Sequence, residues 1–449
     1  MSNDLNSFLF STPEMTRAFS AEEQLRAMMR FEWALTCALE AHGLAEGGSG
    51  AVVHSLLDAG FVDVERLKRE ARDDGNVAIP FVKQLTVVVK ARNERAARTI
   101  HLGATSQDVL DTALILQMRD GVKLLEGAVA KLDAALVQQV RTHRETLLTG
   151  RTWLQAGPPT TLGLKLAGTL VAVRRHRSRI KAACDRTLFL QFGGAVGTLA
   201  ALGDAGGRIS AELARVLELR EPEIPWHAQR DRFVEIVEVL ANLTGSLAKF
   251  ARDIALLMQP EIGEASEGGS ESGGGSSTMP HKHNPVACAG VIAAHERMPG
   301  LVVSMLHAMP QEHERGLGLW QAEWETVPEA FRLTAAAIGF AIEIAEGLVV
   351  NADRMRANFD ALLGVSMAEA VGAVLAQKMG KATAHELLRN AAKRAREEKL
   401  HLGFVLKRMP EVIAQMSAAE IDRVIEPQAY LGSAQRFIAR VLGEPDARR

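Results

Sequence analysis

The sequence predicts an all-α fold, and the main observations behind this prediction concern composition and periodicity. Aromatic residues make up 5% of the chain and tyrosine occurs once, whereas strand-rich proteins need more aromatic and β-branched runs. Two segments carry apolar residues at alternating steps of four and three, which is the spacing of one helix face. These residues are Met118, Val122, Leu125, Val129, Leu132 and Leu136, and then Leu240, Leu243, Leu247, Phe250, Ile254 and Leu257. A third segment, 333–350, is almost uniformly apolar and predicts a helix buried all round. Long helices with such faces pack as a bundle.

The pattern along the chain predicts three regions. Residues 1–110 contain shorter helices, a glycine-rich break at 47–50 and the loop "HLGATSQD", and form an N-terminal helical domain. Residues 111–350 hold the long apolar faces and form a central helical bundle. Residues 351–449 form a small C-terminal domain of shorter helices, punctuated by glycine and proline. The long faces are rich in alanine and poor in polar residues, so we expect helices of other subunits to cover them.

The totals exclude several classes of protein. A formal net charge of -2 gives no general attraction to nucleic acid or to a membrane surface. Cys37, Cys184 and Cys288 are widely spaced, which predicts free buried thiols in a reducing compartment. The N-terminus lacks the basic and apolar regions of a signal peptide, and no stretch of about 18 apolar residues is free of charges. We therefore expect a cytoplasmic protein without a membrane span.

The stretch "GGGSSTMPHKHNP", residues 273–285, admits several readings. A phosphate-binding P-loop is excluded because His281, not glycine, precedes Lys282. A nucleophile elbow is excluded because the Gly-x-Ser-x-Gly pattern after a strand is missing. A metal site is disfavoured because His281 and His283 would face apart on a helix and have no third ligand. A flexible linker and a mobile catalytic lid with hinges at 268–275 remain, and the prolines at 280 and 285 favour a defined loop.

The same stretch resembles a known signature. Residues 275–285 meet every fixed position of Gly-Ser-Ser-x-Met-Pro-x-Lys-x-Asn-Pro, which marks the fumarase/aspartase superfamily. Two further segments, "GATSQDVLDT" at 103–112 and "GRTWLQAGPPTTLGLKLAG" at 150–168, occur in the order that this family shows. The resemblance extends over essentially the whole chain, to "EPQAYLGSAQRF" near the C-terminus.

The resemblance implies an architecture and a chemistry. Members are homotetramers whose central helices form a shared core and whose active sites are shared between subunits. They remove a proton α to a carboxylate and expel a group from the β carbon, without a cofactor or metal. By resemblance Ser276 is the catalytic base, Lys282 stabilises the oxyanion together with backbone N–H groups, and Asn284 binds a substrate carboxylate.

One departure from the family is informative. Many family lyases carry Thr-His where this chain has Thr152-Trp153, and that histidine helps to protonate the leaving group. An indole N–H does not titrate in the useful range. The chain could therefore be an inactive relative, or Trp153 could merely pack, or the leaving group could need no proton. A carboxylate fits the last case, because its conjugate acid has a pKa of about 4.

Expulsion of a carboxylate is the reverse of lactonisation, and one branch of the superfamily lactonises 3-carboxy-cis,cis-muconate. The chain resembles that branch in "RTWLQ", in "PWHAQRDR" at 225–232 and in "EHERGLGLWQAEWETVPE" at 312–329. The implied substrate is a small tricarboxylate, which needs many hydrogen-bond donors. The candidate binding residues are Thr105, Ser106, Gln107, Thr152, Trp153, Gln155, Gln229, Ser277 and Arg315.

Plainer roles compete for some residues. Thr105 and Ser106 could cap a helix that begins near Asp108. Arg230 and Arg232 are expected to be solvated or structural, and Trp320 and Trp324 could lie in the core.

Three alternatives to lactonisation of 3-carboxy-cis,cis-muconate remain open. Adenylosuccinate lyase is disfavoured because "FLFSTPEM" lacks an Arg-Tyr pair and "GNVAIPFVKQL" lacks a histidine. His283 and the inserted "GGSESG" leave room for a 3-substituted analogue such as 3-sulfomuconate. A catalytically silent structural homologue is the non-enzyme alternative.

Overall fold

Helices dominate the computed structural model, which describes residues 5, 7–268, 279 and 282–445. The chain divides into two compact units. Unit 1 comprises residues 1–129, 176–245 and 293–339, and unit 2 comprises residues 130–175, 246–292 and 340–449. The long helices pass from one unit into the other: α7 (Ser106–Thr142), α8 (Leu162–Thr187), α10 (Asp231–Leu257), α11 (Val286–Ala308) and α12 (Leu319–Gly347). The predicted domain boundaries near residues 110 and 350 remain predictions.

Both predicted apolar helix faces are confirmed. The face of α7 from Met118 to Leu136 is at most 6% exposed, and the face of α10 from Leu240 to Leu257 is at most 3% exposed. The segment 333–350 forms the end of α12 and the short strand β4, and it is mostly buried. Glu343 and Glu346 are exposed there, so this helix has one polar edge that the sequence analysis did not predict.

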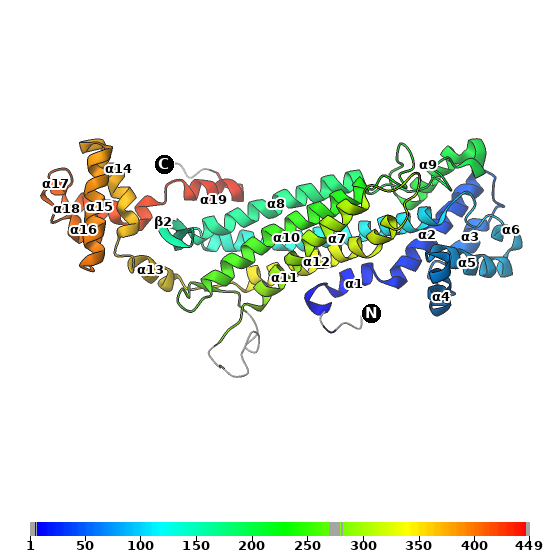
Figure 1. The fold of residues 1–449 in the computed structure, drawn as a ribbon, viewed down its shortest axis with the longest axis horizontal. Coiled ribbons are helices and arrows are strands. Elements are labelled where there is room, and N and C mark those ends of the chain that lie inside the picture. Colours follow the sequence, from blue (N-terminus) through cyan, green and yellow to red (C-terminus); the bar gives the residue numbers. More distant parts are fainter. Residues whose placement is uncertain (1–4, 6, 269–278, 280–281, 446–449) are drawn as a thin grey trace. The chain divides into compact units, whose positions relative to one another are not determined.

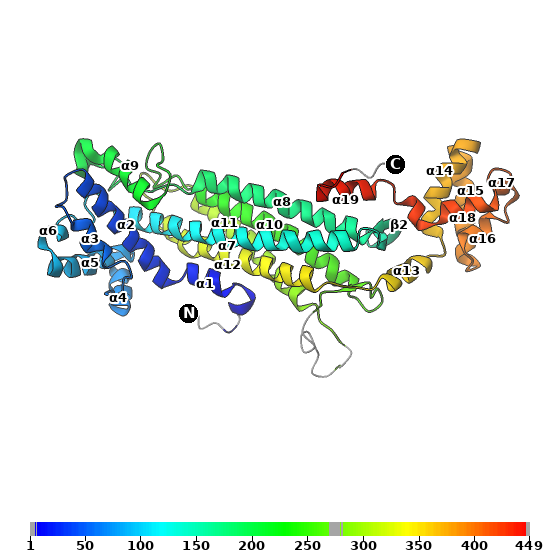
Figure 2. The ribbon, with the colours of Figure 1, turned by 180° about the vertical axis from the view of Figure 1, so that it is seen from behind.

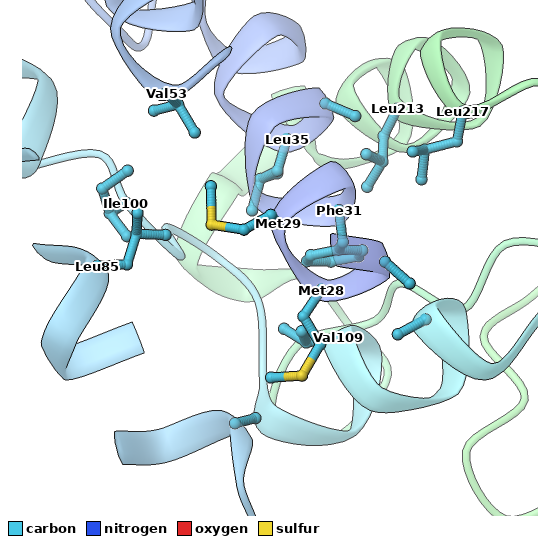
Figure 3. Packing of buried hydrophobic residues seen from close by; sticks show 14 of the residues in the cluster. Met28, Met29, Phe31, Leu35, Val53, Leu85, Ile100, Val109, Leu213 and Leu217 are labelled. Carbon is cyan, nitrogen blue, oxygen red and sulfur yellow. The ribbon is translucent and has the colours of Figure 1, made fainter. Parts of the chain in front are cut away.

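The remaining elements of unit 1 are shorter than the five long helices and precede or follow them in the chain (Figure 1). They are η1 (Ser7–Leu9), α1 (Pro13–Ala18), α2 (Ala21–Ala41), α3 (Ser49–His54), α4 (Val64–Asp74), α5 (Ala78–Arg92), α6 (Glu94–Ala97), η2 (Ala200–Ala205) and α9 (Gly206–Leu217). Helix α2 is central to their core. Figure 3 shows Phe31 and Leu35 of α2 among buried side chains of α7 and α9, including Val109 and Leu213. This packing places the start of α7 against a rigid apolar cluster.

Unit 2 contains the strands and the C-terminal helices (Figure 2). Its elements are β1 (Leu147–Thr152), β2 (Gln155–Thr161), β3 (Ala265–Ser266), β4 (Val349–Val350), α13 (Ala352–Asp360), η3 (Val365–Met367), α14 (Ala368–Met379), α15 (Lys381–Glu397), α16 (Leu402–Leu406), α17 (Pro410–Ile413), α18 (Ala418–Ile425), η4 (Pro427–Tyr430) and α19 (Ala434–Leu442). A cluster that includes Val371, Leu388 and Leu406 forms the core of α14 to α18.

The hairpin of β1 and β2 was not predicted from the sequence. Its strands are antiparallel, with Thr152 opposite Gln155, and Trp153 and Leu154 form the turn. Both turn residues have positive φ, 53° and 62°. A two-residue hairpin loop with a type I′ turn requires positive φ at both of these positions. Such turns normally carry Asn or Gly, because a left-handed conformation costs other residues about 1–2 kcal/mol each. The sequence Trp-Leu therefore gave no turn signal.

The cysteines are less buried than the sequence predicted, and one helix has the length and composition of a membrane span. All three cysteines are free, but only Cys288 is buried, while Cys37 and Cys184 are half-buried. Helix α11 is the one helix in the described residues that is long and apolar enough to cross a membrane by length and composition. The core helix of a soluble protein passes the same test, and α11 carries Glu296 and Arg297 near its middle.

Candidate active site

Arg315 gathers three of the predicted binding residues in unit 1. Its Nη1 donates to Thr105 Oγ1 at 2.7 Å, its Nη2 to Ser106 Oγ at 3.2 Å, and its Nε to Gln107 Oε1 at 3.2 Å. All of these partners are neutral. A guanidinium has five N–H donors, so within the part of the chain that the structure describes the second N–H of each terminal nitrogen remains for another acceptor. The arrangement suits a bidentate contact with a carboxylate.

The start of α7 holds Thr105 and Ser106 in place. Gly103 precedes them with φ +80°, and a Cβ there would lie 2.5 Å from Leu202, so only glycine fits this turn. Helix α7 begins at Ser106, close to the start predicted near Asp108. The Asp108 carboxylate accepts the backbone N–H of Thr105 at 3.0 Å, which is a capping bond. The start of a long helix also favours an anion, because its free N–H groups and its dipole carry positive charge.

Asp108 is a buried hub that the sequence analysis did not identify. One of its carboxylate oxygens accepts from His227 Nε2 at 2.7 Å, from Gln191 Nε2 at 3.1 Å and from the backbone N–H of Gly193 at 3.0 Å. The other accepts the backbone N–H of Gly194 at 2.9 Å. These bonds join the start of α7 to the loop after residue 190 and to the segment before α10. Asp108 thus fixes the position of the residues that hold Arg315.

A second buried network adjoins the first. Gln107 Nε2 donates to Asp111 Oδ2 at 3.1 Å, and Asp111 receives both terminal nitrogens of Arg230 at 2.7 and 3.0 Å. Arg230 also donates from Nε and Nη2 to Glu323, and its side chain is 0% exposed. Trp320 Nε1 donates to Asp111 at 3.0 Å. Arg230 is therefore structural and not solvated, and Trp320 lies in the core.

The charges in this network shift the pKa values of its members. Burial raises the pKa of Glu323 to about 7, although Arg230 opposes the shift, and Asp111 adds to it by repulsion. Burial alone would lower the pKa of Arg230, but Asp111 and Glu323 reverse this and raise it. Arg230 therefore stays charged, and Glu323 is the titrating member of the network near neutral pH.

Thr152, Trp153 and Gln155 lie at the tip of the β1–β2 hairpin in unit 2. All three are exposed, and Trp153 is 96% exposed. Strand β1 is held just before the tip, because Arg151 binds the Glu264 carboxylate through Nη1 at 2.9 Å and Nη2 at 2.6 Å. Asn358 Nδ2 donates to the same carboxylate at 2.8 Å. The hairpin therefore presents the indole from a fixed support.

The signature segment also lies in unit 2. Lys282 is exposed and Asn284 is half-buried, while Ser276 and Ser277 lie outside the described residues, as do the predicted hinges at 269–275. Glu267 stands just before this segment and accepts the backbone N–H of Ala287 at 3.0 Å and of Cys288 at 2.9 Å, just after it. Its carboxylate thus links the residues just before the signature segment to the first turn of α11 and caps that helix.

The structure brings Arg315, Thr105, Ser106 and Gln107 together, and their contact with a substrate stays a prediction. Gln229 does not join them: its side chain is exposed and its backbone N–H donates to Trp226. Asp108, Asp111, His227 and Glu323 were missed, although the motifs that carry the resemblance contain all of them. Among the described residues no group of His, Cys, Asp or Glu could hold a metal ion.

Two families match this sequence. A family described as Lyase matches residues 11–300, and a family described as Adenylosuccinate lyase C-terminus matches residues 364–441. The first match covers more than half of the chain. The chain belongs to this lyase family. The resemblance to the fumarase/aspartase superfamily that residues 275–285 indicated is thus confirmed.

Relatives within the lyase family align over almost the full length. The 3-carboxy-cis,cis-muconate cycloisomerase of Pseudomonas aeruginosa is 46% identical, over 99% of this chain and 97% of that relative. Nitrosuccinate lyase of Streptomyces davaonensis is 37% identical, over 96% of this chain and 92% of that relative. The crystal structure of the 3-carboxy-cis,cis-muconate lactonizing enzyme from Pseudomonas putida superposes with a TM-score of 0.93 at 47% identity, covering 98% of both chains. The predicted helical fold is confirmed.

Proposed function

We propose that this enzyme lactonises 3-carboxy-cis,cis-muconate to 4-carboxymuconolactone. The observation that carries the proposal is the Arg315 guanidinium, which is held by three neutral side chains and has N–H groups left for an anion. The similarity to the cycloisomerase from Pseudomonas aeruginosa supports the substrate. We also propose that the enzyme is a cytoplasmic homotetramer with active sites shared between subunits, and that it binds neither nucleic acid nor membrane.

The reaction is an isomerisation, so its atoms and electrons balance without a cofactor. One carboxylate of the substrate adds through oxygen to the alkene carbon that bears the 3-carboxyl group, and the π electrons move to the neighbouring carbon, which is α to another carboxylate. That carbon then takes a proton. Because the nucleophile is tethered to the alkene, the addition is intramolecular and proximity supplies much of the rate.

The proposed roles follow the order of these steps. Arg315 binds one substrate carboxylate, with Thr105, Ser106 and Gln107 fixing its guanidinium. Lys282 stabilises the enediolate that forms when the oxygen adds, and Asn284 binds a further carboxylate. Ser276 exchanges the proton with the α carbon. Thr152, Trp153, Gln155, Gln229 and Ser277 are the further proposed substrate contacts.

Trp153 is compatible with this chemistry in both directions. In the reverse reaction the leaving group is a carboxylate, which departs as a stable anion, so no acid is required at the position of the indole. Elimination from nitrosuccinate would also release an anion, nitrite. The 37% identical nitrosuccinate lyase therefore supplies the second candidate activity.

The test is consumption of 3-carboxymuconate by purified protein, followed as loss of ultraviolet diene absorbance in the presence of a chelator. Nitrosuccinate, adenylosuccinate, argininosuccinate and fumarate are run beside it. We expect turnover of 3-carboxymuconate to exceed that of each alternative. Ser276→Ala should lower kcat by about 10²–10⁴-fold with helicity unchanged, as expected for loss of a proton-transfer group. Faster turnover of nitrosuccinate, adenylosuccinate, argininosuccinate or fumarate than of 3-carboxymuconate would refute the proposal.

A further inference from the structure

The side chain of Gln311 lies between a buried carboxylate and the backbone beside Arg315. Its Nε2 donates to Glu323 Oε1 at 3.1 Å. Its Oε1 lies directly against Gly316, because a Cβ placed on that glycine would be 2.8 Å away. Gly316 follows Arg315 in the chain. Gln311 therefore packs, without a hydrogen bond from its Oε1, against the backbone next to Arg315.

Glu323 is a firm anchor for this support. Its carboxylate receives Arg230 Nε at 3.0 and 3.1 Å and Arg230 Nη2 at 2.5 Å, and it is nearly fully buried. A further bond closes the same loop, because the backbone N–H of Leu317 donates to Glu312 at 2.9 Å. The segment between α11 and α12 is thus tied down on both sides of Arg315.

The two ends of Arg315 are fixed by separate groups. Thr105, Ser106 and Gln107 hold the guanidinium through hydrogen bonds, whereas Gln311, bonded to Glu323, packs against the backbone at Gly316. An arginine side chain has several rotatable bonds, and an anchored backbone removes alternative positions of its charged end before a ligand binds.

We propose that Gln311, anchored by Glu323, is a positioning residue that presents the free N–H groups of Arg315 to a substrate carboxylate. Neither residue touches the substrate. The inference rests on the proposed function, in which Arg315 binds that carboxylate. Loss of the support should weaken ground-state and transition-state binding alike, so KM should rise while kcat changes little.

A double-mutant cycle tests the proposal with full-length enzyme and 3-carboxymuconate. The variants are Gln311→Leu, Arg315→Ala and the combination of both. We expect Gln311→Leu to raise KM about tenfold with kcat within about threefold. In the Arg315→Ala background the same change should raise KM less than about twofold, because its target is gone. Gln321→Leu is the matched control, because Gln321 is an exposed residue of α12. The KM of this variant should equal that of the wild type.

The KM values of these variants separate the positioning role of Gln311 from the binding role of Arg315 and from the proposed function. An unchanged KM in Gln311→Leu overturns the positioning role, and so does an equal rise in KM in both backgrounds. An unchanged KM in Arg315→Ala overturns both the positioning role and the proposed role of Arg315. No turnover of 3-carboxymuconate by the wild type overturns the proposed function itself.

Discussion

Asp111 and Arg230 form a bidentate ion pair at 2.7 and 3.0 Å, and both side chains are almost completely shielded from solvent. Asp111 stands one turn after Gln107 on α7, and Arg230 directly precedes α10. The pair therefore joins α7, which carries Ser106 and Gln107 and begins directly after Thr105, to α10. Glu323 and Trp320 extend the link to α12.

Removal of the arginine should destabilise the protein strongly. Arg230→Met would leave Asp111 and Glu323 buried without their cation, and breaking a buried pair from one side costs about 3–5 kcal/mol. Urea unfolding at a fixed protein concentration measures the loss. Arg208→Met, at an exposed residue of α9, is the control and should stay within about 0.5 kcal/mol of the wild type. Equal stabilities of the two variants would contradict the structural role of Arg230.

Glu323 should make stability depend on pH below neutrality. In the unfolded chain its carboxyl ionises near its ordinary pKa of 4.5, whereas burial keeps it protonated in the folded protein up to about pH 7. Between these values only the unfolded state loses the proton, so the free energy of unfolding falls as pH rises. The shift corresponds to about 3 kcal/mol. Above pH 7 this group causes no further change.

Unfolding curves of Glu323→Gln at several pH values between 4.5 and 8 measure this dependence. The amide does not ionise, so the fall in stability across this range should be smaller in the variant by about 3 kcal/mol. Glu325→Gln, on the same helix at an exposed site, should keep the slope of the wild type. Parallel slopes for all three proteins would show that Glu323 ionises normally in the fold.

Gly268 borders the signature segment and should tolerate no side chain. Its φ is +65°, and a Cβ would lie 1.9 Å from the carbonyl oxygen of Gly347. Gly75 has a similar φ of +74° but open space around it. Gly75→Ala should cost about 1–2 kcal/mol from the backbone conformation alone. Gly268→Ala should cost at least about 1 kcal/mol more in urea unfolding, because the β3–β4 contact must also shift.

The sequence predicted the helical bundle well because burial of an apolar face has a direct periodic signature. The faces of α7 and α10 are one example each, and every predicted member is buried. The site was predicted only in part. Resemblance identified Arg315 and its neutral partners, but the roles of Asp111 and Glu323 depend on contacts between residues far apart in the chain, such as Arg230 with Glu323. A single sequence contains no periodic signal for such a pair.

The hairpin of β1 and β2 escaped prediction for a different physical reason. Its turn is made by Trp153 and Leu154 at positive φ, which local propensity disfavours. The conformation is retained because the surrounding structure holds it, including the Arg151–Glu264 pair at the base. A departure from local rules at a residue where the chain also departs from the pattern that the resemblance implies is consistent with a functional position.

Trp153 offers the decisive test of how the leaving group departs. Trp153→His places an imidazole where many relatives have one, and histidine tolerates a left-handed turn better than most residues. Because Trp153 is 96% exposed, stability should change by less than about 1 kcal/mol. If the expelled carboxylate needs no proton, kcat for opening of 4-carboxymuconolactone should gain no limb that titrates near pH 6.5, although KM can rise through lost contact with the indole.

The profile of kcat against pH from 5.5 to 8 distinguishes the possibilities for Trp153→His, with Trp153→Phe as a control that lacks both the indole N–H and an imidazole. Similar shapes for the wild type and both variants are expected, because the rate does not depend on an acid at this position. A rise of kcat in Trp153→His below pH 6.5, absent from Trp153→Phe, would mean that protonation of the leaving group limits the reaction. The chemistry would then be that of an elimination whose leaving group is a poor anion, and lactonisation would be the wrong reaction.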